Sequence, residues 1–337
     1  MLNIIWFVLI AVLFIGFFFL EGFDYGAGIL HFFVAKSDEE RRVVMNSIGP
    51  FWDGNEVWMI TAGGALFASF PEWYATLFSG FYLALILILL GLIIRGVSFE
   101  FRSKVESEGW RKLWDYTFSI GSFIAALIWG VAVGNFLRGV PIGPDKYYHG
   151  GLLPLLNPYA LSAGLAILFL FTFHGANYLA IKTEGPVNER AKEYSRKVWW
   201  LALIFTVIFV IWSFFDTDIF TAPGAWLVYL SVVVAAVSLI VAGIYAFKGK
   251  FGAAFVGSSL TIVFAVIMTF AGLYPRVMIS TIDPKYSLTI YNASSSQYTL
   301  KSMLIVAIIL VPVVLAYQIW TYYTFREKVG SGKNLEY

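Results

Sequence analysis

Four acidic residues in apolar surroundings are the side chains of this sequence best placed to carry chemistry. Glu21 and Asp24 lie within the long apolar run 2–34, and Asp53 and Glu56 lie near the start of a second run. Within each pair the acids are three positions apart, so a helix would place them on one face. An ionised carboxylate that faces lipid costs about 2.5 kcal/mol or more. All four acids are therefore expected to face protein or water.

Two interpretations of these acids stay open at this level. In the first, the acids pair with Arg95 or with backbone groups and only lock neighbouring helices together. In the second, they form a proton or ion route, and we favour it because acids inside a membrane usually mark such routes. Gly22 and Gly26, on either side of Asp24, form a pair of small residues that lets a neighbouring backbone approach closely.

The elements that must position these acids are membrane-spanning helices. Of the 337 residues, 59% are hydrophobic and 13% are charged, whereas about a quarter of the residues of a soluble domain are charged. An apolar stretch of about 20 residues can cross the hydrocarbon core as a helix. We expect nine crossings, at 2–34, 49–70, 74–95, 117–137, 158–180, 198–215, 225–247, 253–273 and 301–325.

Stretch 49–70 is the least apolar of the nine because it contains two of the acids, and loop charge decides whether it crosses. If all nine stretches cross, 18 of the 23 basic residues lie on one side, as the positive-inside rule expects of cytoplasmic loops. The basic loops 36–42 and 95–112 then share a side, and 74–95 crosses between them, so 49–70 must cross too. This topology places the N-terminus outside, the C-terminus in the cytoplasm, and the four acids in the cytoplasmic half of the membrane.

The fold class expected from this pattern is an all-α polytopic membrane protein with one membrane domain over 1–337. We expect two four-helix bundles plus one peripheral helix. Two similar helix ends, Phe23-Asp24-Tyr25-Gly26-Ala27 and Phe173-His174-Gly175-Ala176, suggest an internal repeat of 1–140 and 155–275, with the last helix at about 301–325. There is no cysteine and the net charge is only +2, so neither disulfides, nor thiolate metal sites, nor nucleic-acid binding are expected.

The other polar residues have simpler expected roles. Arg95, at the inner end of its helix, is expected to extend to the interface. Arg102 and Asp115 are expected to be solvated loop charges. His174 is expected to be a hydrogen-bonded packing residue, and His31 to be solvated at the interface. No two histidines are four positions apart, so neither a haem-ligand pair nor a metal site is expected in this chain.

Several motifs together resemble subunit II of cytochrome bd quinol oxidase. They are Gly22-Phe23-Asp24-Tyr25-Gly26, Asn46-Ser47-Ile48-Gly49-Pro50-Phe51-Trp52-Asp53-Gly54-Asn55-Glu56-Val57-Trp58, Thr61-Ala62-Gly63-Gly64-Ala65-Leu66-Phe67-Ala68, Arg102-Ser103-Lys104, Trp110-Arg111 with Trp114-Asp115, and Gly134-Asn135 before Gly139-Val140-Pro141. The match is strong over residues 12–142, and beyond them it depends on length, helix count and topology. The long block 46–58 is far more specific than a short motif.

The resemblance implies a nine-helix subunit in the bacterial or archaeal cell membrane, paired with a larger subunit I. That complex oxidises a quinol and reduces oxygen to water. Haem b, haem d and the quinol-oxidising loop belong to subunit I, so no catalytic centre is expected in this chain. The chain would stabilise subunit I and conduct cytoplasmic protons. Asp53 matches the family position assigned to proton entry and Asp24 matches the other acid of helix one, with Glu56 and Glu21 assisting. A quinone held as a structural lipid, without an assigned residue, and a small single-helix subunit are further partners that the resemblance allows.

Two other classes of function stay open. A secondary transporter or ion-coupled carrier could use the four acids for a cation or a proton. Against it, the predicted helix 158–180 has only His174 and Asn177 where the predicted helix 2–34 has two acids. A site shared between symmetric halves is therefore not indicated. A structural scaffold for the haem subunit is the third class, and it is compatible with the oxidase interpretation.

Overall fold

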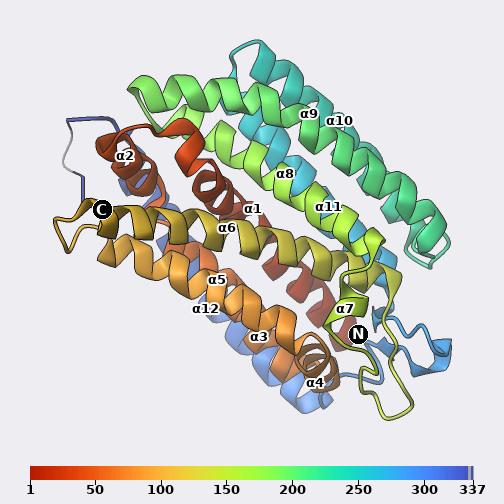
Figure 1. The fold of residues 1–337 in the computed structure, drawn as a ribbon. Coiled ribbons are helices and arrows are strands. Elements are labelled where there is room, and N and C mark those ends of the chain that lie inside the picture. Colours follow the sequence, from red (N-terminus) through yellow and green to blue (C-terminus); the bar gives the residue numbers. More distant parts are fainter. Residues whose placement is uncertain (333–334, 337) are drawn as a thin grey trace.

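The computed structural model describes residues 1–332, 335 and 336, and most of them lie in helices that run side by side (Figure 1). The helices are α1 (Leu2–Val34), α2 (Asp38–Ile48), α3 (Trp52–Ser69), α4 (Pro71–Gly80), α5 (Tyr82–Phe101), α6 (Glu108–Arg138), α7 (Leu152–Leu155), α8 (Pro158–Lys182), α9 (Gly185–Asp216), α10 (Ala225–Phe247), α11 (Phe251–Leu273) and α12 (Gln297–Thr324). Two short strands, β1 (Arg276–Met278) and β2 (Leu288–Thr289), flank a 3₁₀ turn, η1 (Pro284–Tyr286).

Eight of the described helices are long and apolar enough to cross a membrane, namely α1, α5, α6, α8, α9, α10, α11 and α12. Each overlaps a predicted crossing, and several extend further than the apolar stretch. The protein is therefore an all-helical, multi-pass membrane protein. Helix α3 has 18 residues and carries the acids of the least apolar stretch.

Helix α1 runs through the middle of the bundle and packs against α3, α6, α8 and α11. Every residue from Leu20 to Gly28 is buried, although this segment contains Glu21 and Asp24. A helix segment that is buried all round has no lipid-facing side, so its polar groups must be met by other helices. The bundle therefore encloses these two acids, as the sequence predicts.

The closest approach of α1 is to α8, at Gly26 and Gly175. A Cβ atom placed on Gly26 would lie 2.8 Å from the Cα of Gly175 and 2.0 Å from the carbonyl oxygen of Phe171. A Cβ atom on Gly22 would lie 2.9 Å from the ring of Phe171. The expected close approach of a neighbouring backbone is confirmed at Gly26, where α8 makes it, whereas the neighbour of Gly22 is the Phe171 side chain.

Helices α3 and α12 lie beside each other and run in opposite directions. Near the end of α3, Ser69 O accepts a hydrogen bond from Ser295 N, just before α12 begins. Nearer its start, Trp58 Nε1 donates to Gln318 Oε1 over 2.9 Å, in the last third of α12. Along the described helix α12, Leu300 is the one buried residue. Helix α12 is thus peripheral to the rest of the chain.

Two segments differ from the sequence-based expectation. The predicted crossing 74–95 is not a single helix. It begins inside α4 and continues into α5, and the helix is interrupted at Phe81 (φ −97°, ψ 16°). The basic segment before α3, expected to be a loop, contains helix α2. Its start is stabilised by a capping box, in which Ser37 Oγ accepts from Glu40 N and Glu40 Oε2 accepts from Ser37 N.

The two long connections after α6 and α11 are joined to each other at the end of the bundle where α1 begins. Val140 N donates to Ile279 O, and Thr281 N donates to Val140 O. The second connection also holds the start of α1, since Asn3 Nδ2 donates to Ile290 O over 2.8 Å. These two connections, which the predicted topology places outside, therefore lie at the same end of the bundle as the N-terminus.

Candidate functional site

Arg95 of α5 lies at the centre of a buried charge cluster with acids of α1 and α3. Its Nη1 atom is 2.6 Å from Glu21 Oε1 and 2.6 Å from Glu56 Oε1. The side chains of Arg95 and Glu21 are fully buried, and that of Glu56 is 14% exposed. The guanidinium carbon also lies 5.1 Å from the centroid of the Tyr25 ring. The expectation that Arg95 extends to the interface is wrong, because the two acids hold the guanidinium inside the bundle.

Asp24 is enclosed in the same region, but it bonds to an amide instead of a cation. Asn55 Nδ2 donates to Asp24 Oδ2 over 2.7 Å, and both side chains are fully buried. Asn55 Oδ1 in turn accepts from Tyr322 Oη over 2.8 Å. Asp24 is therefore connected through Asn55 to the peripheral helix α12. The sequence places Asn55 inside a predicted crossing, but nothing in it indicates these partners.

Asp53 lies outside this cluster. Its side chain is exposed in the single chain, at the start of α3. Other exposed residues of α3 follow it at helical spacing, namely Val57, Ile60, Gly64 and Phe67. The structure thus brings together Glu21, Asp24 and Glu56, and leaves Asp53 on the outer face of α3.

A second buried charge cluster lies near the C-terminal end of α1, at His31, and was not anticipated. Asp115 Oδ1 is 2.9 Å from His31 Nε2 and 2.6 Å from Arg102 Nε, and Asp115 Oδ2 is 3.2 Å from Arg41 Nη1. His31, Arg102 and Asp115 are all buried, so their expected roles as solvated residues are wrong. Helix α6 begins at Glu108, before the apolar stretch, and so carries Asp115 against α1.

His174 is a packing residue, as expected. Its Nδ1 atom is 2.7 Å from Ser258 Oγ and its Nε2 atom is 3.2 Å from Phe19 O. Its ring stacks on Phe255 with centroids 4.5 Å apart and an interplanar angle of 8°. Both ring nitrogens are therefore engaged within the chain. Among residues 1–332, 335 and 336, no group of three or more His, Cys, Asp and Glu side chains is arranged to hold a metal ion.

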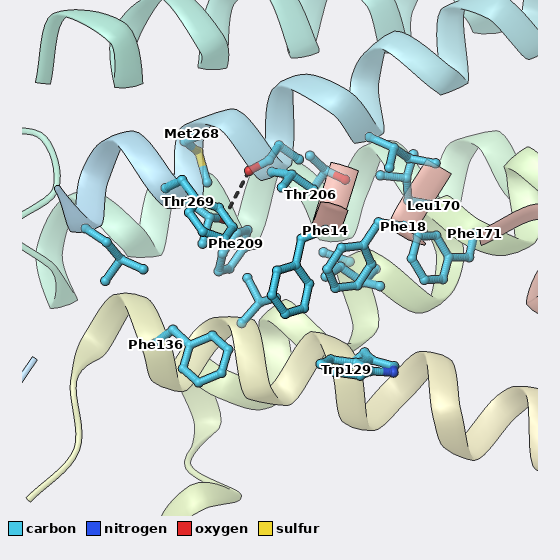
Figure 2. Close-up of a pocket in the computed structure, with 18 of the residues that line it drawn as sticks. Phe14, Phe18, Trp129, Phe136, Leu170, Phe171, Thr206, Phe209, Met268 and Thr269 are labelled. Carbon is cyan, nitrogen blue, oxygen red and sulfur yellow. Dashed lines mark hydrogen bonds between the residues drawn. The ribbon is translucent and has the colours of Figure 1, made fainter. Parts of the chain in front are cut away.

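An apolar cavity of about 90 Å³ lies between α1, α6, α8, α9 and α11, with α3 and α4 contributing to its wall. Figure 2 shows Phe14 and Phe18 between α6, which carries Trp129 and Phe136, and α11, which carries Met268 and Thr269. Two polar atoms of its lining residues, Trp129 Nε1 and Thr206 Oγ1, are buried without a hydrogen-bond partner in the described chain.

The fold and these clusters define a multi-pass helical membrane protein that encloses acids and an arginine in its bundle. Over residues 2–325 the chain matches the family described as cytochrome bd terminal oxidase subunit II. It is 40% identical over 336 residues to cytochrome bd ubiquinol oxidase subunit 2 of Bacillus subtilis (strain 168), covering 100% of this chain and 99% of that relative. The chain therefore belongs to the cytochrome bd terminal oxidase subunit II family.

Further relatives agree with this assignment. The chain is 38% identical over 358 residues to cytochrome bd-I ubiquinol oxidase subunit 2 of Escherichia coli (strain K12), covering 96% of this chain and 93% of that relative. Its fold is similar to a chain in the structure of bd oxidase from Geobacillus thermodenitrificans, with a TM-score of 0.78 and 16% identity, covering 96% of this chain and 97% of that chain. The resemblance seen in residues 12–142 is thus confirmed, and this chain is one subunit of a respiratory terminal oxidase in the cell membrane.

Proposed function

We propose that this chain pairs with a haem-bearing subunit I of a quinol:oxygen oxidoreductase, stabilises that subunit, and passes cytoplasmic protons toward its oxygen-reduction site. Its relatives in Bacillus subtilis and Escherichia coli carry the name of ubiquinol oxidase subunits, which supports the shared reaction. The observation that carries the proton role is an acid, Asp53, exposed on a membrane helix next to a buried acid cluster.

The exposure of Asp53 argues that the outer face of α3 is covered by a partner. An ionised carboxylate that faces lipid costs about 2.5 kcal/mol or more. Polar groups of a partner would remove that cost. A Cβ atom on Gly54 or on Gly64 would meet nothing within 4 Å in the chain alone, so a partner backbone could approach α3 closely here. We propose that subunit I covers this face, and that Asp53 then lies between the two subunits.

From Asp53, the other acids continue into the bundle. Glu56 follows Asp53 by one turn of α3 and contacts Arg95, and Arg95 contacts Glu21. Glu21 precedes Asp24 by one turn of α1. We propose that Asp53 and Glu56, with Glu21 and Asp24, exchange protons that enter from the cytoplasm. The ion pairs with Arg95 also tie α1, α3 and α5 together, so the structural role of Glu21 and Glu56 is part of the same proposal.

The test is Asp53→Asn in the complete oxidase, purified in mild detergent with its partner. Quinol oxidase turnover should fall while the reduced-minus-oxidised haem spectrum stays unchanged. Glu100→Gln, which neutralises an exposed acid at the inner end of α5, serves as the matched control and should keep full turnover. Full activity of Asp53→Asn would remove the proton role, and loss of the haems would indicate a role in assembly instead.

A colourless single chain that moves substrate in liposomes would contradict the oxidase assignment and favour a carrier.

We also propose nine crossings, with the N-terminus outside. Helix α3 lies along α12, an apolar helix of spanning length, and contacts it near both ends, which supports a crossing by α3. Two four-helix halves, one of α1, α3, α5 and α6 and the other of α8 to α11, are supported by their matching contacts. The fourth long helix of each half packs on the first helix of the other, α6 on α8 and α11 on α1. Helix α12 would then be the extra, peripheral helix.

The apolar cavity supports a further proposal, that this chain holds a quinone as a structural lipid. Its aromatic and aliphatic walls fit an isoprenoid or a ring, and Trp129 Nε1 and Thr206 Oγ1 would offer hydrogen bonds to a ring carbonyl. A cavity of about 90 Å³ is small for a whole quinone, so its walls would have to move apart. Lipid extraction from the purified complex should yield more quinone than extraction from a control variant in which Ala166→Phe fills the cavity. Equal amounts would contradict the proposal.

A further inference from the structure

The peripheral helix α12 carries two polar side chains that face the buried acid region. Gln318 and Tyr322 are four positions apart, so they share a face of α12. Both contact Asn55 Oδ1, with Tyr322 Oη at 2.8 Å and Gln318 Nε2 at 3.4 Å. The Tyr322 ring also stacks on Phe51, with centroids 4.4 Å apart and an interplanar angle of 3°. Leu300 is the one buried residue of the described helix α12, which is also bonded to α1 near its start, where Gln297 Nε2 donates to Asn3 Oδ1 over 3.0 Å.

The orientation of the Gln318 and Asn55 amides follows from Trp58, whose indole N–H can donate a hydrogen bond but cannot accept one. An indole N–H has no acceptor lone pair, so Trp58 Nε1 must donate to an oxygen. That requirement turns the amide of Gln318 so that its Oε1 faces Trp58, at 2.9 Å. The NH₂ group of Gln318 then faces Asn55, which must present its own oxygen to it. The NH₂ group of Asn55 is left to face Asp24, where it donates to Oδ2 over 2.7 Å.

We infer that Gln318 and Tyr322 are positioning residues for Asp24, because they hold the Asn55 amide in the one orientation that donates to the carboxylate. A flipped amide would aim its oxygen at Asp24 and could bond only to a protonated acid. It would also aim its NH₂ group at that of Gln318, two donors without an acceptor between them. Helix α12 therefore stabilises Asp24 as a hydrogen-bond acceptor, the state in which it is ready to take a proton. This inference rests on the proposed proton role of Asp24.

The test uses Tyr322→Phe together with Gln318→Met in the complete, haem-loaded oxidase. Tyr322→Phe keeps the ring that stacks on Phe51 and removes the donor, and Gln318→Met keeps the chain length. Loss of a hydrogen bond of ordinary strength changes an equilibrium about fivefold, so the Asn55 amide should spend less time in the orientation that donates to Asp24, and turnover should fall. Tyr323→Phe, one residue further along α12 and 64% exposed, is the matched control and should have no effect.

An infrared measurement separates positioning from general damage to the fold. Difference spectra between acidic and alkaline samples should contain a carboxyl band that Asp24→Asn removes. In the α12 double variant that band should shift, while the haem spectrum stays that of the wild type. Added to Asp24→Asn, the α12 substitutions should cause no further loss of turnover.

Two results would overturn the inference, and a third would overturn only the proposed function. If the Asp24 band is unchanged in the α12 double variant, α12 does not position Asp24. If the α12 substitutions reduce turnover equally with and without Asp24, their effect is structural. If Asp24→Asn keeps full turnover, the proton role of Asp24 fails, and the infrared band still decides whether α12 orients the amide.

Discussion

At the scale of single residues, Arg95 is the cation of the buried acid cluster. Its guanidinium is buried between Glu21 and Glu56, which come from two different helices. A buried cation of this kind balances charges that would otherwise be unpaired inside the membrane. Removal of one member of a buried ion pair costs about 3–5 kcal/mol, mostly because its partner is left unpaired.

Arg95→Met should therefore strongly destabilise the complex, and the midpoint of its thermal unfolding in detergent should fall. The triple variant Arg95→Met, Glu21→Gln, Glu56→Gln should recover most of that loss, since a buried ion pair often adds little over neutral side chains of similar size. The measurement is the loss of the haem spectrum and of native oligomer on heating. If the triple variant unfolds at as low a temperature as Arg95→Met, unpaired charge is not the cause of the destabilisation.

A second residue-scale prediction concerns Glu40, in the short helix α2. Glu40 Oε2 accepts from Arg190 Nη1 over 2.7 Å and from Lys36 N over 2.6 Å. The hydrogen bond from Arg190 holds the pKa of Glu40 below its usual range. The unfolded value is about 4.3. Because the folded pKa is the lower one, Glu40 contributes stability that is complete above that pH and is lost as the pH falls through the folded pKa.

Glu40→Gln should accordingly lower the unfolding midpoint of the complex at pH 7. The difference from the wild type should begin to shrink once the pH falls below about 4.3, where the acid of the unfolded chain becomes neutral, and should be lost as the pH falls through the lower folded pKa. Thermal unfolding in detergent between pH 3.5 and 7 would measure it. Glu189→Gln, an exposed acid on α9 with a side chain 73% exposed, is the control and should change little. A difference independent of pH would exclude the ionised form as the source of stability.

At the scale of helices, the contact between α1 and α8 depends on two glycines. Gly26 and Gly175 allow the two backbones to touch, and this contact sets the position of the part of α1 that carries Glu21 and Asp24. Small residues at such crossings are the usual means of close helix packing in membranes. The pair also occupies matching positions in the two proposed halves, which would place the crossing near the symmetry axis.

Gly26→Val should separate α1 from α8 and reduce both assembly with the haem subunit and thermal stability. We expect a loss of about 1–3 kcal/mol or more, as for other overpacked contacts. Gly252→Ala, at the start of α11, is the matched control, because a Cβ atom there meets nothing within 4 Å. The yield of haem-containing complex and its unfolding midpoint measure the effect. Equal behaviour of the two variants would show that the α1–α8 contact tolerates a side chain.

At the scale of the whole molecule, the proposed topology can be tested directly because the sequence contains no cysteine. Single cysteines at Lys36 and Glu72, the exposed residues that flank α2 and α3, should lie on opposite sides of the membrane if α3 crosses. In intact cells, a membrane-impermeant maleimide should label Glu72→Cys. It should label Lys36→Cys only after permeabilisation. Labelling of both from the same side would exclude a crossing by α3.

Properties that belong to a single stretch of chain could be predicted from the sequence. Hydrophobic length located the eight apolar helices, and the acids at 21 and 24 were recognised as buried because lipid exposure of a charge is costly. The glycine pair at 22 and 26 indicated a close crossing, although not its partner. The family assignment followed from the block 46–58, since so long a match is specific without any structure.

The partners of each charge depend on how the helices are rotated and where they cross, and only the tertiary structure decided them. Glu56 and Asp53 are three positions apart on α3, yet Glu56 reaches Arg95 and Asp53 does not, because the rotation of α3 turns only Glu56 inward. Asp115 and His31 are far apart in sequence and meet because α6 begins early and packs on α1. Hydropathy is summed over a local stretch of sequence, so it carries no information about how the helices are rotated against each other. The sequence by itself therefore determined which segments enter the membrane, and the packing of those segments determined which acids are paired, which one is exposed, and which is held by α12.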